Sequence, residues 1–340
     1  MNKLTKIGVS ALCGSLAGIA SANAGDLSVT GGVDMSWISL DDETTGNPIG
    51  IGSNMGFTGS GELDNGWSVA LGIYHANQSG YTETNVKVTV PSMGVFQIDQ
   101  GSSGTGMDRY DDVTPNVWEE AYGTGLGTGI DTVSGVAGAA NIEWTPNMMP
   151  DGFTAAIAVS PDAGGSKSAD KASSGDDGGF LGSGYDIIAS ADGGNFGMDG
   201  LTIKAGYSKT EQDNQSSSVS GDKDERTIAA TYAMGNFTVG YQWSEEDLGL
   251  NTGVNLYENT GWGVTFSVND DLSIGYNNYE SEQNNHNGSH VTAEASSFQI
   301  AYTMGGASIR LAEASIDNAK YQTTATFDRD ATTLSVSLAF

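Results

Sequence analysis

The sequence predicts an all-β protein, a transmembrane antiparallel β-barrel of about sixteen strands. Three observations predict this class: the pattern of the last strand, a secretory leader followed by no helical span, and connections that alternate between short and long. The first two observations concern the two ends of the 340-residue chain, and the third concerns the residues between them. Together they favour a barrel over any soluble β fold.

The last strand separates apolar from small polar side chains. Side chains of a strand alternate between its two faces, so residues of one parity share a face. One parity carries Thr332, Leu334, Val336, Leu338 and Phe340, and the other carries Thr333, Ser335, Ser337 and Ala339. An apolar outer face that ends on an aromatic residue is typical of the closing strand of a membrane barrel. We therefore expect Phe340 to lie at the periplasmic girdle.

The first residues predict a secretory signal peptide over residues 1–24, which is cleaved. It has a basic region, an apolar stretch and a cleavage site of small residues: Lys3 and Lys6, residues 7–20, and Ala22-Asn23-Ala24. The mature chain is then a single barrel domain, residues 25–340. Cys13 is the only cysteine and lies in the leader, so we expect no disulfide and no thiol chemistry in the mature chain.

Charge and hydropathy exclude two classes of protein. The formal net charge is −29, and removing Lys3 and Lys6 from the 13 basic residues leaves 11 against 42 acidic residues, a net charge of −31. Such a surface repels nucleic acid, so we expect no nucleic-acid partner. After the leader no apolar run reaches the 18 or so residues of a helical span. A closed barrel is the remaining way across a bilayer, because an open sheet leaves backbone groups unpaired in lipid.

Alternating segments recur along the mature chain and predict the strands. Clear examples are residues 67–74, 237–244, 272–277 and 297–303. Each segment alone also fits an antiparallel sandwich. Aromatic residues, however, recur at the segment ends on the apolar parity, as a membrane-interface girdle requires. The 13 Tyr, 10 Phe and 6 Trp also argue against a disordered acidic chain.

The connections alternate in length and give the strand count. Short turns are expected at residues 63–66, 91–94, 145–152, 192–200, 234–236, 269–271 and 304–306. Longer polar loops are expected near residues 41–50, 77–82, 102–135, 162–180, 211–223, 246–254, 281–290 and 317–326. Seven turns and eight loops predict sixteen strands, with both termini on the short-turn side. The last strand then pairs with the strand that begins near Asp26, because an even barrel closes first to last.

With these features the chain resembles the general diffusion porins of Gram-negative bacteria, specifically the alphaproteobacterial (Rhodobacter-type) family. The resemblance covers the leader, the Gly25-Asp26-Leu27-Ser28-Val29-Thr30-Gly31 opening, a long third loop and Phe340. It implies a homotrimer in the outer membrane, among lipid and lipopolysaccharide, that passes ions and small hydrophilic solutes passively. It also implies that Phe340 belongs to the signal read by the barrel-assembly machinery.

The third long loop, residues 101–135, is the candidate pore constriction. It is far longer than a hairpin needs and is rich in acidic and aromatic side chains. In the family that the chain resembles, this loop folds into the barrel and narrows it opposite basic wall residues. We expect Asp111, Asp112, Glu119 and Glu120 to include the acidic side of the constriction. The alternative for each residue is an exposed acidic loop outside the pore.

Strand parity predicts the basic wall. Lys87 alternates with valines, Lys204 lies between Ile203 and Ala205, and Arg310 lies between Ile309 and Leu311. A lysine or arginine facing lipid at mid-membrane costs roughly 2–4 kcal/mol, so we expect all three to face the lumen. The alternative is solvated lining with no special partner. An acidic loop facing a basic wall sets up a transverse field, and the excess of acid predicts weak cation preference if it lines the pore.

The sequence predicts no metal, no cofactor and no enzymatic site. Acidic runs that are candidates for loop-bound Ca²⁺ are Asp41, Asp42, Glu43, Glu245, Glu246 and Asp247, for which solvation is the favoured interpretation. His286 and His290 have a zinc-like spacing, but the Asn-rich segment between them is a poor helix former. No nucleophile elbow or P-loop is present, and an outer-membrane hydrolase would lack an evident Ser–His pair.

A passive porin is therefore the predicted function, and two alternatives stay open. One is a substrate-specific outer-membrane channel. The other is a non-conducting barrel that serves adhesion or surface structure through the polar loops near residues 162–180 and 211–223. A secreted calcium-binding β-roll lacks the repeated glycine-rich nonapeptide that such a fold needs.

Overall fold

The computed structural model describes residues 27–41, 47–77, 81–100, 104–130, 132–164, 181–212 and 218–339. The predicted leader and its cleavage site, the first residues of the mature chain and Phe340 lie outside the described residues. Within the described ranges, no helix has the length and apolar character needed to cross a membrane.

The described residues form sixteen strands and five short 3-10 helices. The strands are β1 Ser28–Leu40, β2 Ile49–Glu62, β3 Ser68–Ala76, β4 Tyr81–Val90, β5 Gly94–Gln100, β6 Ala140–Pro146, β7 Phe153–Ser160, β8 Leu181–Asp192, β9 Leu201–Gln212, β10 Lys223–Met234, β11 Phe237–Asp247, β12 Val254–Ser267, β13 Leu272–Asn285, β14 His290–Met304, β15 Ala307–Asp317 and β16 Arg329–Ala339. The 3-10 helices are η1 Gly106–Tyr110, η2 Ala121–Gly123, η3 Gly193–Phe196, η4 Ala319–Tyr321 and η5 Ala325–Phe327.

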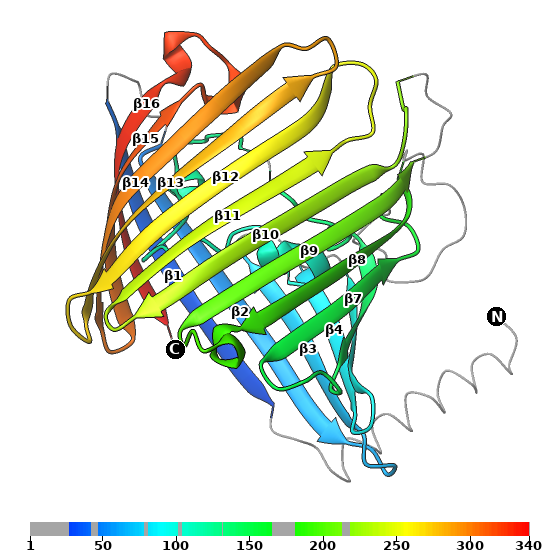
Figure 1. Cartoon of the computed structure of the whole chain (residues 1–340). Helices are drawn as coiled ribbons and strands as arrows, with labels where there is room; N and C mark the ends of the chain where they lie inside the picture. The colour runs from blue at the N-terminus through cyan, green and yellow to red at the C-terminus, as the bar shows by residue number, and fades with distance from the viewer. Residues whose placement is uncertain are drawn as a thin grey trace, which may run out of the picture.

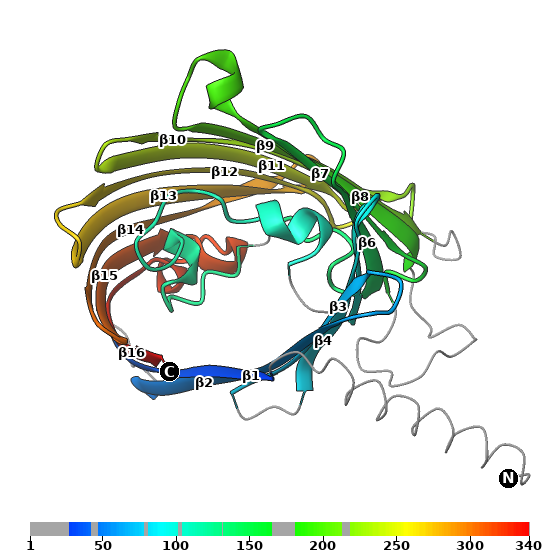
Figure 2. The same ribbon diagram turned by 90° about the horizontal axis from the view of Figure 1, so that it is seen from below.

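Each strand pairs antiparallel with its neighbours in sequence, and β1 pairs with β16, so the sheet is closed (Figures 1 and 2). The seam register places Met35 opposite Val336 and Gly32 opposite Ala339. The predicted barrel, its sixteen strands and the pairing of first strand with last are confirmed. Closure leaves no unpaired sheet edge, which is what permits a sheet to stand in lipid.

The connections follow the predicted alternation of short turns and longer loops in most places but not in all. Residues 77–80, part of an expected loop, make a connection of four residues between β3 and β4, whereas residues 193–200, expected as a short turn, make one of eight residues between β8 and β9. A loop was expected over residues 281–290, but β13 runs to Asn285 and β14 begins at His290, so the connection is a tight turn. The pairs Glu282↔Thr292 and Asn284↔His290 continue the ladder through this polar segment. Polar side chains do not interrupt a strand whose backbone has a partner, so composition alone was misleading here.

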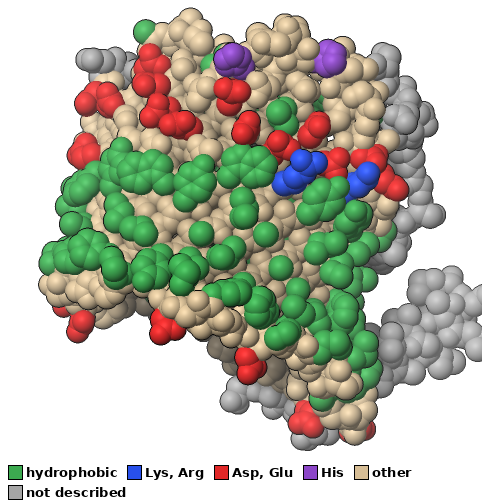
Figure 3. All heavy atoms as spheres, viewed as in Figure 1, with side chains coloured by type: hydrophobic (Ala, Val, Ile, Leu, Met, Phe, Trp, Pro, Cys, Tyr) green, Lys and Arg blue, Asp and Glu red, His purple; other side chains and the backbone are tan. Residues whose placement is uncertain are grey.

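Burial in this barrel is the reverse of that in a soluble protein. Ile228 and Tyr241 are each 52% exposed on the outer face, whereas the adjacent Ala229 and Gln242 are 3% and 1% exposed on the inner face. On the face shown in Figure 3, hydrophobic side chains form bands across the outer wall, and acidic side chains lie beyond them, most of them toward one rim. This is the apolar surface with flanking aromatic residues that a membrane barrel requires.

The last strand has the predicted parity. Leu334 and Leu338 are exposed on the outer face, while Thr333 and Ser335 are buried on the inner face. Thr333 contacts the third loop through a hydrogen bond from its hydroxyl to Thr124 O at 3.0 Å. The inner face of the closing strand is thus covered by another part of the chain.

The third loop, between β5 and β6, lies inside the ring of strands rather than outside it (Figure 2). Its second half packs against the connection between β15 and β16, where Lys320 N donates to Thr128 O at 2.6 Å. This contact builds an apolar cluster inside the barrel. Its buried members are Ala121, Leu126, Ala293, Ala295, Ala314, Ile316, Ala319, Tyr321 and Ala331.

Candidate pore constriction

Buried glutamines on the inner wall hold the middle of the third loop. Gln242 of β11 accepts a hydrogen bond from Val113 N at 2.9 Å and donates to Tyr110 O at 2.7 Å. Gln299 of β14 accepts from Trp118 N at 3.0 Å. A buried amide needs partners for both its oxygen and its nitrogen, and here the loop backbone supplies both kinds.

Glycines on the wall let the loop lie flat between these two glutamines. Gly240 and Gly263 of β11 and β12 face Pro115, and a Cβ added at Gly240 would meet Pro115 Cδ at 2.5 Å. At Gly263 the added atom would overlap the Pro115 carbonyl. Any larger side chain at either position would therefore lift the loop from the wall toward the lumen.

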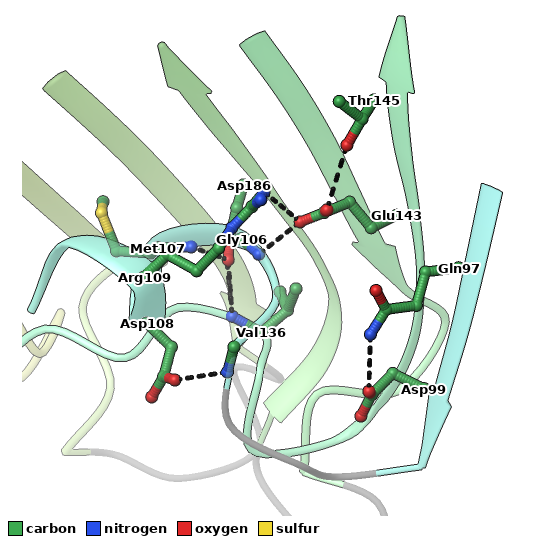
Figure 4. A network of polar contacts seen from close by, with 11 residues as sticks. Gln97, Asp99, Gly106, Met107, Asp108, Arg109, Val136, Glu143, Thr145 and Asp186 are labelled. Carbon is green, nitrogen blue, oxygen red and sulfur yellow. Dashed lines mark hydrogen bonds and ion pairs between the residues drawn. The ribbon is translucent and has the colours of Figure 1, made fainter. Parts of the chain in front are cut away.

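Three wall carboxylates hold the two ends of the loop, and Figure 4 shows two of them, Glu143 and Asp186. Glu143 of β6 accepts from Gly106 N at 2.7 Å and pairs with Arg109 at 2.6 Å. Asp186 of β8 accepts from Met107 N at 2.9 Å and from Val136 N at 3.1 Å. Glu225 of β10 accepts from Gly135 N at 2.7 Å. The loop is thus fixed at its ends and in its middle.

The four predicted acidic residues lie on this loop inside the barrel, in two different environments. Asp112 and Glu119 are exposed, Asp111 is half-buried and Glu120 is buried. Burial and the neighbouring Asp112 raise the pKa of Asp111 to about 9. Burial and the charge of Asp112 also raise the pKa of Glu120 to about 8. At neutral pH these two groups are therefore mostly protonated and contribute little charge.

Two opposing effects act on the pKa of the Glu119 carboxyl. Desolvation raises the pKa of its carboxyl, and the nearby Arg310 acts against that shift. Its backbone carbonyl accepts from Asn277 Nδ2 at 3.2 Å, which fixes the residue on the wall of β13. The loop thus presents Asp112 and Glu119 to the lumen, with Asp111 and Glu120 behind them.

Two of the predicted basic residues lie beside the loop. The Lys204 ammonium lies 5.2 Å from the centre of the Tyr110 ring, within the range of a cation–π contact. The Arg310 guanidinium lies 5.5 Å from the centre of the Trp118 ring and forms an ion pair with Asp34. Both side chains therefore point into the barrel, as strand parity predicts.

The third basic residue, Lys87, lies on β4 and is exposed. Its cross-strand neighbour is Gln97, which is in turn opposite Glu143. Because Glu143 contacts the loop, this row belongs to the inner face, and Lys87 lies in it. The structure thus brings Lys204 and Arg310 to the loop and places Lys87 on another part of the lumenal wall.

A cavity of about 450 Å³ lies on the inner wall formed by β1, β2, β3 and β16. Asp34, Asn54, Asn77 and Arg310 contribute its polar lining, and glycines of β1 and β2 leave it wide. The lumen is therefore open beside the seam, where the wall carries small and polar residues.

The acidic runs considered for calcium are mostly ion-paired or outside the described residues. Glu245 contacts Arg226 at 3.2 Å, and Glu246 contacts Lys223 at 2.5 Å. Asp42 and Glu43 are not among the described residues. In the described ranges, no group of three or more His, Cys, Asp or Glu side chains is arranged to hold a metal ion.

The wall residues that hold the loop are absent from the predicted site, although the sequence contains a signal for them. Glu143 lies between Ile142 and Trp144, and Asp186 lies between Tyr185 and Ile187. An acidic residue flanked by outward apolar residues must face the lumen, by the same parity rule that was applied to the basic residues. Which loop atoms it meets there depends on the tertiary structure.

A closed barrel that holds an acidic loop inside it is the architecture of an outer-membrane channel protein. A family model described as Gram-negative porin matches residues 8–307. The chain belongs to this family, as the sequence predicts. A comparison with curated protein sequences finds no match.

Solved structures share the fold at low sequence identity. Salmonella typhi OmpF, in a complex with daunomycin, is 11% identical with a TM-score of 0.70, over 92% of this chain and 97% of that one. The trimer form of Vibrio cholerae OmpT is 12% identical with a TM-score of 0.64, over 93% and 100%. A mutant of the Rh. blastica porin is 13% identical with a TM-score of 0.56, over 93% and 100%. These likenesses concern the fold alone.

Proposed function

We propose that this porin forms a water-filled pore for passive diffusion of ions and small hydrophilic solutes, with a weak preference for cations. The observation that carries the proposal is the acidic third loop inside the barrel, with Asp112 and Glu119 exposed on it. Fixed negative charge beside a narrow aqueous path raises the local concentration of cations and lowers that of anions.

The basic residues of the lumen offset this charge only in part. Arg109 is paired with Glu143, Arg310 with Asp34, and Lys223 with Glu225 and Glu246. Each of these pairs presents no net positive charge to a passing ion. The positive charges that remain beside the loop or on the lumenal wall include Lys204, Lys87 and Arg329, which donates to Leu126 O of the loop at 3.0 Å. They oppose the charge of Asp112 and Glu119, which is why the proposed preference is weak.

Planar-bilayer recording with a salt gradient tests the proposal. We expect discrete conductance steps and a reversal potential of the sign that cation permeation gives. Block of the current by one solute class at low concentration would instead favour a substrate-specific channel. A correctly folded, heat-modifiable preparation that forms no channel would contradict the proposal and favour a surface or adhesion role.

The finer identity and the setting of the protein are part of the same proposal. We propose an alphaproteobacterial, Rhodobacter-type porin, on the basis of the sequence features that resemble that family: the opening of the first strand, the long third loop and the terminal Phe340. We also propose a homotrimer, in keeping with the trimer form of the similar V. cholerae protein. The proposal also includes cleavage near Ala24, recognition of Phe340 by the assembly machinery and contact with lipopolysaccharide. N-terminal sequencing checks the cleavage near Ala24. Gel mobility of unheated samples checks the homotrimer.

A further inference from the structure

Both ends of the third loop meet at a single buried carboxylate of the wall. Asp186 is 0% exposed, and its side chain accepts hydrogen bonds from Met107 N at 2.9 Å and from Val136 N at 3.1 Å. Met107 lies near the start of the loop and Val136 near its end. One side chain of β8 therefore ties together two points that lie far apart along the loop.

The loop backbone reaches Asp186 only because glycines stand where it passes. Gly106 and Gly135 adopt φ values of +53° and +59°, the left-handed region that favours glycine. A Cβ added at either position would overlap the Asp186 carboxylate. Both ends of the loop are thus shaped to fit the same side chain.

The wall around Asp186 forms a straight cross-strand row on the inner face. Register places Glu143 opposite Ala158, Ala158 opposite Asp186, Asp186 opposite Ser208, and Ser208 opposite Glu225. Acidic and small residues therefore alternate along the row. The small residues leave room for the loop backbone, and the acids accept its N–H groups, because a carboxylate can accept several such bonds.

The outer members of the row each hold one end of the loop. Glu143 accepts from Gly106 N at 2.7 Å, and Glu225 accepts from Ser134 N at 3.1 Å and Gly135 N at 2.7 Å. Asp186, between them, holds both ends. Its position makes it the member of the row whose loss loosens both ends of the loop together rather than one of them.

We propose that Asp186 is the positioning residue of the constriction: it closes the base of the third loop and thereby keeps the acidic segment at one fixed place in the lumen. Glu143 and Glu225 support it from either side. The role belongs to the wall and not to the acidic residues of the loop, so it is separable from ion selectivity. The positioning role depends on the proposed channel function only in the experiment that measures current.

A distance measurement tests the proposal without any current. Spin labels at Asp112→Cys on the loop and Asn54→Cys on the wall of β2 report the position of the loop; both residues are exposed. The full chain carries Cys13→Ser, so that the introduced cysteines are its only thiols. We expect one narrow distance distribution, which Asp186→Asn broadens because the neutral amide keeps one acceptor oxygen in place of two and binds Met107 N and Val136 N more weakly than the carboxylate does. Glu313→Gln, which removes an exposed acid of β15, leaves it narrow.

A second variant moves the loop without changing the wall. Gly135→Ala drives a methyl group against the Asp186 carboxylate, whereas Gly104→Ala places it where no heavy atom lies within 4 Å. Both glycines have positive φ, +59° at Gly135 and +96° at Gly104, so the control substitution carries at least as much backbone strain. We expect broadening from Gly135→Ala and much less from Gly104→Ala. This pair keeps the test available if Asp186→Asn does not fold.

Single-channel current gives the functional result. In Asp186→Asn we expect the occupancy of subconductance states to rise about tenfold, which corresponds to ~1.4 kcal/mol, with reversal potential unchanged in the main open state. A narrow, unshifted distance distribution in folded Asp186→Asn and Gly135→Ala overturns the proposal. Absence of current in the unaltered protein, with a distance distribution that responds as expected, contradicts the channel function and leaves the positioning role standing.

Discussion

Arg310 of β15 reaches across β16 to form an ion pair with Asp34 of β1, so it bridges the seam where the barrel closes. Ser335 of the intervening strand donates to the same carboxylate at 2.5 Å. The three strands that meet at the seam are therefore joined by side chains as well as by backbone hydrogen bonds. This contact also fixes Arg310 beside Trp118 of the third loop.

Loss of Asp34 is expected to weaken the seam. Asp34→Asn leaves the partly buried guanidinium without its counter-charge, which typically costs about 1–3 kcal/mol. The midpoint of urea or thermal unfolding, followed by gel mobility, measures the change. Arg226→Gln is the matched control, because the Arg226–Glu245 pair lies at an exposed site and should contribute about 0–1 kcal/mol. Equal effects of the two variants would mean that the seam pair adds no special stability.

The two exposed loop acids are expected to control ion selectivity at neutral pH. Asp112→Asn and Glu119→Gln remove charge from the lumen and should lower the cation-to-anion permeability ratio. Glu120→Gln should change it little at pH 7, because the pKa of Glu120 is raised to about 8. Reversal potentials in a salt gradient provide the measurement. A full effect of Glu120→Gln with none from Asp112→Asn would reverse the assignment.

Cation preference is expected to increase between about pH 7 and pH 10. The pKa values of Asp111 and Glu120 are raised to about 9 and about 8, so both groups lose a proton and gain negative charge over this range. The double variant Asp111→Asn, Glu120→Gln should flatten the profile. Reversal potentials recorded at several pH values test this, and a profile that is equally steep in the double variant would point to other groups.

The glycine wall is expected to set the width of the pore. Gly263→Ala should push Pro115 away from β12 and lower the conductance, with an overpacking cost of about 1–3 kcal/mol. Gly275→Ala is the milder comparison, since its added Cβ would meet Val117 Cγ1 at 3.2 Å, Thr265 Cγ2 at 3.3 Å and Val264 O at 3.4 Å, whereas the Cβ added at Gly263 would lie 2.2 Å from Pro115 O. Single-channel conductance in the same salt compares the two. An unchanged conductance in Gly263→Ala would show that the loop moves along the wall rather than into the lumen.

Deletion of Phe340 is expected to impair membrane assembly more than conductance. In the sequence, Phe340 shares the parity of Leu334 and Leu338, the side chains of which are exposed on the outer face of β16. The yield of folded protein in the outer membrane and the conductance of the fraction that assembles are measured separately. Normal yield with altered conductance would contradict this prediction.

The sequence predicts the barrel well because strand periodicity is a local property. Parity at Lys204 and Arg310 places both side chains inside, and the structure shows them beside Tyr110 and Trp118. The same rule gives the inner face of β16. The segment 281–290 is one exception, because its polar composition resembles a loop while its backbone remains paired.

The wall contacts that hold the third loop cannot be predicted from one sequence. Gln242 and Gln299 bind loop residues that lie more than a hundred positions away along the chain. Whether a lumenal glutamine meets water or a loop backbone depends on how far the loop travels around the wall. The acidity of the loop is visible in the sequence, but the protonation of Asp111 and Glu120 follows only from their burial.

The hydrogen bond between Thr333 and Thr124 has a consequence for the order of events during assembly. The loop belongs to the first half of the chain, yet Thr333, one of the residues that hold it, lies on the final strand. A barrel that has not yet closed therefore lacks some of the wall contacts that hold the loop. We expect the pore constriction to form last. A barrel stalled before insertion of β16 should be wider inside than the finished one, which accessibility of a thiol placed at Asp112→Cys can report.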